Sequence, residues 1–209
     1  GNPGANLAMG AYSLQKGDLE AGFNSVLTAF QSSVLSKEAK LPILRSYMTK
    51  AFRTKNTEDI MQASKLAEAL ATANPEAIEG FASLGSLAVL ENHDEEAKIA
   101  FEKALAIDNT PYSLWQDYFM VLSRLHDYPA IVQHGEELLS LFPTHALLLF
   151  TVGHANYETK NYQTALQYLK RAADYAYDNA LLGDIYLMIG DTYQALQDNS
   201  EAEKYYKMA

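Results

Sequence analysis

Apolar residues recur along this chain at the three- and four-residue spacing that places them on one side of an α-helix. Short polar turns interrupt this spacing, and the 209 residues contain only 6 prolines and 11 glycines. Residues 77–90 carry one apolar face, the polar residues 91–94 follow, and residues 95–107 form a second amphipathic segment. The pattern predicts an all-α chain made of helix pairs.

The helix pairs repeat with a period of 34 residues, and residues of similar size recur at equivalent positions. The clearest columns are Ala51, Gly85, Phe119 and Gly153; Ala63, Ala97, Ile131 and Ala165; and Tyr47, Phe81, Trp115 and Leu149. The period continues at Gly190 after a shift of three residues, and it reaches back to Gly10 across a seven-residue insertion. We therefore expect one solenoid domain over residues 1–209 with six units, at about residues 3–36, 44–77, 78–111, 112–145, 146–182 and 183–209.

The small residues in these columns predict where the helices of a pair touch. Two helices joined by a very short turn are antiparallel neighbours, and Gly153 facing Ala165 would let their backbones approach closely. One pair cannot bury its apolar side alone, so consecutive pairs are expected to stack. The fourth unit departs from the pattern, because Phe119 stands at the small position and Gly135 at a large one.

The charge and composition exclude several classes of partner. The net charge of −10 would repel a nucleic acid or an anionic membrane surface, and no apolar stretch approaches the length of a membrane span. The chain has no cysteine, which excludes disulfides, thiolate zinc sites and a cysteine nucleophile. The compartment stays open: the cytoplasm, or the periplasm or cell envelope if a leader has been removed.

Candidate catalytic and metal-binding residues do not form a recognisable constellation. The five histidines are scattered, and His126 and His134 lie on either side of a turn rather than on one helix face. Glu95 and Glu96 stand at a helix start, where the helix dipole explains the first of them. Phosphate-binding glycine loops and nucleophile motifs are missing from the sequence. We therefore expect no enzyme activity, no cofactor and no metal ion.

The repeat pattern resembles the tetratricopeptide repeat family. The residues that carry the resemblance are Phe81, Leu84, Gly85, Ala97, Phe101 and Ala104, and then Tyr186, Ile189, Gly190, Ala202 and Tyr206. The resemblance covers nearly the whole chain. It implies a right-handed α-α superhelical solenoid of antiparallel helix pairs, and we expect the chain to be a fragment of a longer bacterial protein of this family.

The resemblance also implies a binding surface, because the first helix of each pair lines the concave side of such solenoids. Carried over to this sequence, it predicts a peptide-binding groove that mixes aromatic, apolar and polar side chains and suits peptide capture. The alternative is that these side chains meet the next turn of the superhelix or water. The candidate groove residues are Arg45, Met48, Phe52, Gln116, Met120, Arg124, Phe150, His154, Tyr157, Leu187 and Asp191.

These inferences predict a protein-interaction scaffold that binds a protein or peptide partner. The alternative is a regulatory or docking region of a larger protein whose catalytic domain lies outside this sequence. Self-association is a further expectation, since the last helix carries Ala202, Tyr205, Tyr206 and Met208 and lacks the polar outer face of a capping repeat.

Overall fold

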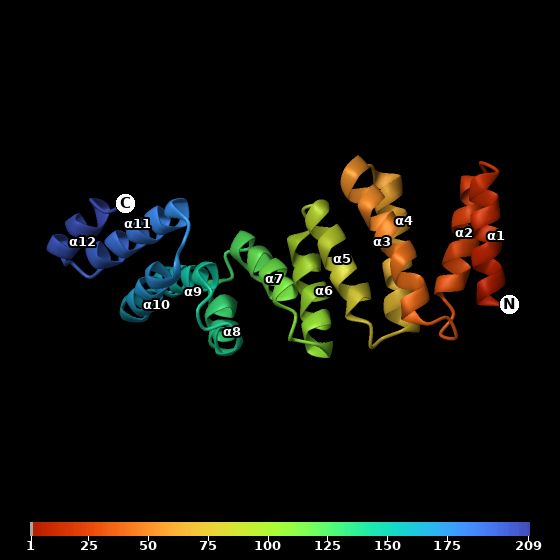
Figure 1. The fold of residues 1–209 in the computed structure, drawn as a ribbon. Coiled ribbons are helices and arrows are strands. Elements are labelled where there is room, and N and C mark those ends of the chain that lie inside the picture. Colours follow the sequence, from red (N-terminus) through yellow and green to blue (C-terminus); the bar gives the residue numbers. More distant parts are fainter. Residues whose placement is uncertain (1) are drawn as a thin grey trace. The chain divides into compact units, whose positions relative to one another are not determined.

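The computed structural model describes residues 2–209, and within them it contains twelve α-helices and no strand (Figure 1). The predicted all-α class is confirmed. The chain divides into two compact units, Gly1–Val121 (unit 1) and Leu122–Ala209 (unit 2), and the division falls inside α7. The helices are α1 (Pro3–Gln15), α2 (Leu19–Phe30), α3 (Lys37–Thr54), α4 (Thr57–Ala73), α5 (Ile78–Leu90), α6 (Asp94–Ile107), α7 (Tyr112–Arg124), α8 (Tyr128–Leu141), α9 (Ala146–Glu158), α10 (Tyr162–Tyr175), α11 (Asn179–Ala195) and α12 (Asn199–Tyr206).

A residue with positive φ ends the turn between the two helices of every pair in residues 2–209. These residues are Gly17, Lys55, Asn92, His126, Lys160 and Gln197, with φ between 53° and 85°. The left-handed backbone lets the first helix end and the chain reverse within a very short turn. In four pairs the next residue is an N-cap whose side chain accepts a hydrogen bond from the following helix: Asp18, Asn56, Asp127 and Asp198. Turn and cap together start the second helix at a fixed place.

The helices of a pair approach most closely at glycine, as the columns predicted. A Cβ built on Gly85 would lie 2.6 Å from Cε1 of Phe101, and one on Gly153 would lie 2.8 Å from Cγ of Leu169. The nearest side chain to Gly153 is therefore Leu169, four residues after the Ala165 that the sequence suggested. Each glycine leaves a space that a large side chain of the second helix fills, so no other residue fits without displacing that side chain.

The two irregular places in the period have visible structural causes. The three-residue shift before the last unit lengthens a helix, because α11 has 17 residues whereas α5 and α9 have 13. The insertion near residue 36 becomes a linker between α2 and α3, followed by an α3 of 18 residues. Both irregularities lie before or at the start of the first helix of a pair, so the residues at the crossing inside the pair, such as Gly190 against Tyr206, keep their place.

A buried lysine fastens the linker between α2 and α3. The side chain of Lys40 is fully buried, and its ammonium donates hydrogen bonds to the carbonyl of Ser32 (2.9 Å) and to Oδ1 of Asn74 (2.5 Å). Both acceptors follow the C-terminus of a helix, α2 and α4, where the helix dipole favours a cation. Burial lowers the pKa of Lys40, and the charge of Glu76 opposes that effect. The lysine thus ties the end of α2 to the end of α4.

Replacing Gly85 with alanine should destabilise the protein. The new methyl group would overlap the ring of Phe101, which is 1% exposed and cannot move aside. Overpacking of this kind costs more than the helix propensity that alanine gains, so we expect a net loss of about 1–2 kcal/mol in the free energy of unfolding. Urea denaturation measures it. Gly183→Ala is the matched control, since its Cβ would meet only the carbonyl of Ala209 at 3.6 Å; equal effects of the two changes would contradict the crossing argument.

Candidate functional site

The predicted residues of α9 form a row of interacting side chains in unit 2. The rings of Phe150 and His154 are stacked, with centroids 6.4 Å apart and 15° between the planes. Nε2 of His154 lies 3.3 Å from Oε1 of Glu158. Tyr157 is half-buried and makes a tilted ring contact with Tyr162 of α10, with centroids 5.6 Å apart. The structure therefore brings Phe150, His154 and Glu158 together as one ordered strip.

Two residues that the repeat analysis did not select join this strip. The ring of Tyr128 meets that of His154 edge-on, with centroids 5.5 Å apart, and its hydroxyl lies 3.0 Å from Nδ1 of His126. Burial raises the pKa of Tyr128, and the nearby charge of Glu158 raises it further. His126 and Tyr128 lie in and just after the turn between α7 and α8, where the repeat columns carry no information about side-chain contacts.

The second part of the predicted surface in unit 2 lies on α11, and α12 completes it. The Tyr206 hydroxyl lies 2.8 Å from Oδ1 of Asp191 and 2.9 Å from Oε1 of Gln194. Burial and the bond to Asp191 raise the pKa of Tyr206 to about 12. Helices α9 and α11 are in contact. Burial raises the pKa of Tyr157, and the charge of Asp191 raises it further. Leu187, one helical turn before Asp191, is 48% exposed.

The other predicted groove residues differ in how exposed they are. In α3, Arg45 and Phe52 are exposed, but Met48 is half-buried and packs against the core residues around Leu44 and Ala51. In α7, three residues spaced four apart are exposed: Gln116, Met120 and Arg124. Arg45, Met48, Phe52, Gln116 and Met120 belong to unit 1, whereas Arg124, Phe150, His154, Tyr157, Leu187 and Asp191 belong to unit 2. A groove continuous over all eleven stays a prediction.

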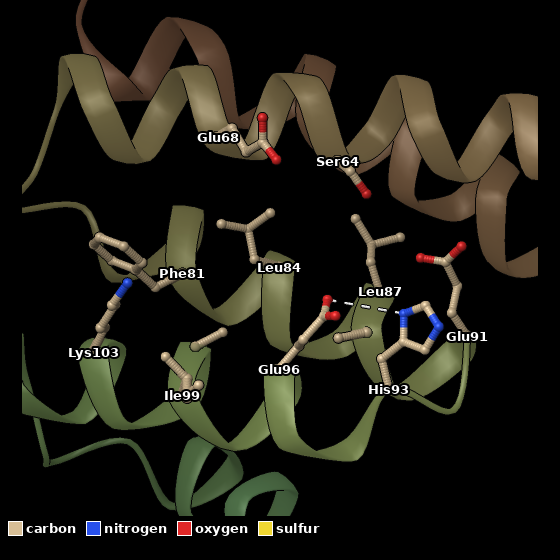
Figure 2. Close-up of a pocket in the computed structure, with 12 residues that line it drawn as sticks. Ser64, Glu68, Phe81, Leu84, Leu87, Glu91, His93, Glu96, Ile99 and Lys103 are labelled. Carbon is tan, nitrogen blue, oxygen red and sulfur yellow. Dashed lines mark ion pairs between the residues drawn. The ribbon is translucent and has the colours of Figure 1, made fainter.

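A cavity of about 490 Å³ lies in unit 1 between α4, α5 and α6, and the sequence analysis did not anticipate it. Figure 2 shows Leu84 and Leu87 pointing from α5 toward α4, whose Ser64 and Glu68 point back into the same space. Phe81 of α5 and Ile99 of α6 extend the apolar lining. Charged side chains and one histidine lie around its rim: Glu68, Glu91, Glu96 and Lys103, with His93.

Charged clusters elsewhere in the described chain have structural explanations. The carboxylate of Asp59 lies 2.6 Å from Nζ of Lys50 and accepts hydrogen bonds from Thr54 and Asn56. These interactions, with Lys50 first, lower the pKa of Asp59 and hold the turn between α3 and α4. Among residues 2–209, no group of three or more His, Cys, Asp or Glu side chains is arranged to hold a metal ion. No helix in this range has the length and apolar character needed to cross a membrane.

Comparison with known proteins identifies the repeats. Residues 78–111 and 183–209 each match the family model of the tetratricopeptide repeat. A search of curated proteins finds no match to this chain. The fold is similar to a crystal structure of the MamA protein, with a TM-score of 0.69 and 18% identity over 81% of this chain and 89% of that chain.

Two further solved structures share the fold. MamA from Desulfovibrio magneticus RS-1 aligns with a TM-score of 0.67 and 14% identity, over 80% of this chain and 92% of that chain. YrrB, described as a TPR protein with an unusual peptide-binding site, aligns with a TM-score of 0.66 and 17% identity, over 78% of this chain and 82% of that chain. At these identities the similarity establishes the fold.

Changing Asp191 to asparagine should lower the pKa of Tyr206 from about 12 part of the way toward the usual tyrosine value of about 10. Burial, the larger cause, remains, so the pKa should stay above the usual value. Because the folded pKa is raised, the associated stability is present below pH 10 and is lost as the pH rises through about 12. NMR titration of the tyrosine ring carbons, assigned with Tyr206→Phe, measures it. The change Asp184→Asn, on an exposed part of α11, should leave the value unchanged.

The predicted self-association surface is partly used inside unit 2. Ala202 is 3% exposed, and the Tyr205 ring packs against Tyr186 and Tyr193. The Tyr206 ring packs on Gly190 and its hydroxyl bonds to Asp191, so Met208, at 48% exposure, is the residue of this set that remains most accessible. Self-association through this end should appear in light scattering as a mass that rises with concentration and falls in Met208→Lys. A constant monomer mass for residues 1–209 would contradict it.

Proposed function

We propose that this chain, a helical repeat protein of the tetratricopeptide type, is a protein-interaction scaffold that binds a peptide segment of its partner on the first helices of its pairs. Its partners are proteins or peptides. The observation that carries the proposal is the ordered strip on α9, where Phe150 and His154 stack and His154 pairs with Glu158.

The chemistry of this surface suits an extended or helical peptide. Phe150 and Tyr157 offer ring faces to apolar side chains. The imidazole of His154 and the carboxylates of Glu158 and Asp191 can accept or donate hydrogen bonds to a peptide backbone and pair with a basic side chain. The contacts among these side chains hold them before a ligand arrives, which reduces the entropy that binding must overcome.

A structure with the same fold supports peptide binding as the class of function. YrrB is described as a TPR protein with an unusual peptide-binding site. Helical repeats in general present extended surfaces because each unit contacts only its neighbours and leaves one side of its first helix uncovered. We therefore place the peptide on the surface of α9 and α11 in unit 2.

The double change Phe150→Ala and Tyr157→Ala should weaken peptide binding. Peptides selected from a random library against residues 1–209 provide the ligands, and fluorescence anisotropy measures their affinities. Aromatic side chains at the centre of an interface typically contribute about 2 kcal/mol, so we expect a loss of about thirtyfold.

Two controls separate lost contacts from lost folding. Tyr177→Ala removes an aromatic ring that is 99% exposed between α10 and α11, and it should leave the affinity unchanged. Thermal unfolding of the double variant, followed by circular dichroism, should still show one folded helical protein at the assay temperature. Peptides that bind the folded double variant as tightly as the parent chain would refute the assignment.

A further inference from the structure

We propose that the cavity between α4, α5 and α6 is a second docking surface, and that its occupant is a short amphipathic helix of a partner protein with basic residues beside its apolar face. The proposal rests on the scaffold function proposed above but not on the surface of α9 and α11. The two surfaces can therefore be tested separately.

The cavity and the predicted groove lie on different sides of α5. Phe81, Leu84 and Ala88 line the cavity, and their spacing of three and four places them on one side of the helix. In this helix the resemblance to the tetratricopeptide repeat implies that Glu79, Ala82, Ser86 and Val89 face the groove. At about 100° per residue, the average directions of the two sets differ by about 145°. A ligand in the cavity would therefore leave the groove side of α5 free.

The floor and one wall of the cavity are apolar and only partly covered. Leu84 and Phe81 are half-buried, and Ile99 on α6 is 52% exposed. The small residues Ala88 and Ala100 lie between them and create the space. Uncovered apolar side chains grouped in a hollow favour an apolar ligand face, since burying them removes their surface from water.

The rim selects the charge of the partner. Glu68 extends from α4, Glu91 from the end of α5 and Glu96 from α6 (Figure 2). The ammonium of Lys103 lies over the ring of Phe81, 5.9 Å from its centroid, and His93 lies 3.9 Å from Glu96. The rim therefore carries three carboxylates and one lysine, and the chain as a whole carries a net charge of −10. A segment with Lys or Arg beside its apolar residues complements this rim, and an acidic segment is repelled.

The length of the hollow fits a short helix. Its lining on α5 and the residue that follows runs from Phe81 to Glu91, eleven residues or about 15 Å along the helix axis. This is about three helical turns. Leucine-like side chains spaced three and four apart on such a segment would rest on the floor, and basic residues on either side would reach Glu68 on one wall and Glu96 on the other. This is the helix-in-groove mode of recognition.

The test uses residues 1–209 and a labelled synthetic peptide of about four helical turns, with leucine along one face, lysine on both flanks and alanine elsewhere. Fluorescence anisotropy should show saturable binding that weakens with added salt. Glu96→Lys should weaken binding about fivefold, because it replaces an attractive charge with a repulsive one at a partly exposed site. Its neighbour Glu95, which is exposed in the same helical turn but outside the cavity, supplies the control Glu95→Lys, with little change expected.

A second pair of variants tests the apolar floor. Ile99→Ala should weaken binding about tenfold, whereas Ile107→Ala, which removes an exposed isoleucine at the end of the same helix, should not. In two-dimensional NMR spectra the peptide should shift the amide signals of Leu84, Ala88 and Ala100. The double variant Phe150→Ala and Tyr157→Ala should bind the basic peptide normally even where it loses the library peptides.

Several results would overturn the inference. These are no binding of the basic peptide, equal binding of a peptide with glutamate in place of lysine, equal effects of the Glu95 and Glu96 changes, or amide shifts centred on α9 and α11. The last result would show that the basic peptide binds the surface of α9 and α11 instead of the cavity. If only the library peptides fail to bind at α9 and α11, the proposed function is contradicted and the inference about the cavity is not.

Discussion

The close crossing of the two helices within a pair, as in α5–α6 and α9–α10, is the constraint on which the rest of each unit depends. At Gly85 and Gly153 the space that a side chain would need already holds Phe101 and Leu169. This contact fixes one side of the first helix against the second helix. It therefore also fixes which neighbours the other sides of the first helix meet. One packs on the adjoining pair, and the remainder faces solvent, where a partner can reach it.

The two surfaces proposed for binding differ in chemistry because their polar groups are placed differently. On α9 and α11 the side chains are amphipathic and contact one another, as in the stack of Phe150 on His154 and the bond from Tyr206 to Asp191. Between α4 and α6 the floor is apolar and the charges lie at the rim. The first surface offers hydrogen bonds together with ring contacts, and the second offers apolar burial with selection by charge. A scaffold with both could hold two partners, or two segments of one partner, at the same time.

Two buried charged side chains hold the linker before α3 and the turn after it. Lys40 joins the linker after α2 to the end of α4, and it can be buried because two oxygens just after helix C-termini accept hydrogen bonds from its ammonium. Asp59 similarly joins Lys50 and Thr54 across the turn between α3 and α4. Both cases place a charge inside the fold with its hydrogen bonds satisfied, which is the condition for burying it without a large loss of stability.

The sequence by itself determined the helices, their pairing and the position of the irregularities. These features follow from local patterns: apolar spacing, recurrent small residues and short polar turns. It also placed Phe150, His154 and Tyr157 on one face, since helical spacing alone does so. Only the tertiary structure decided that Tyr128 joins His154, that Tyr206 bonds to Asp191, and that a cavity opens beside α5. These contacts depend on how side chains from separate helices meet, and a repeat period carries no information about that geometry.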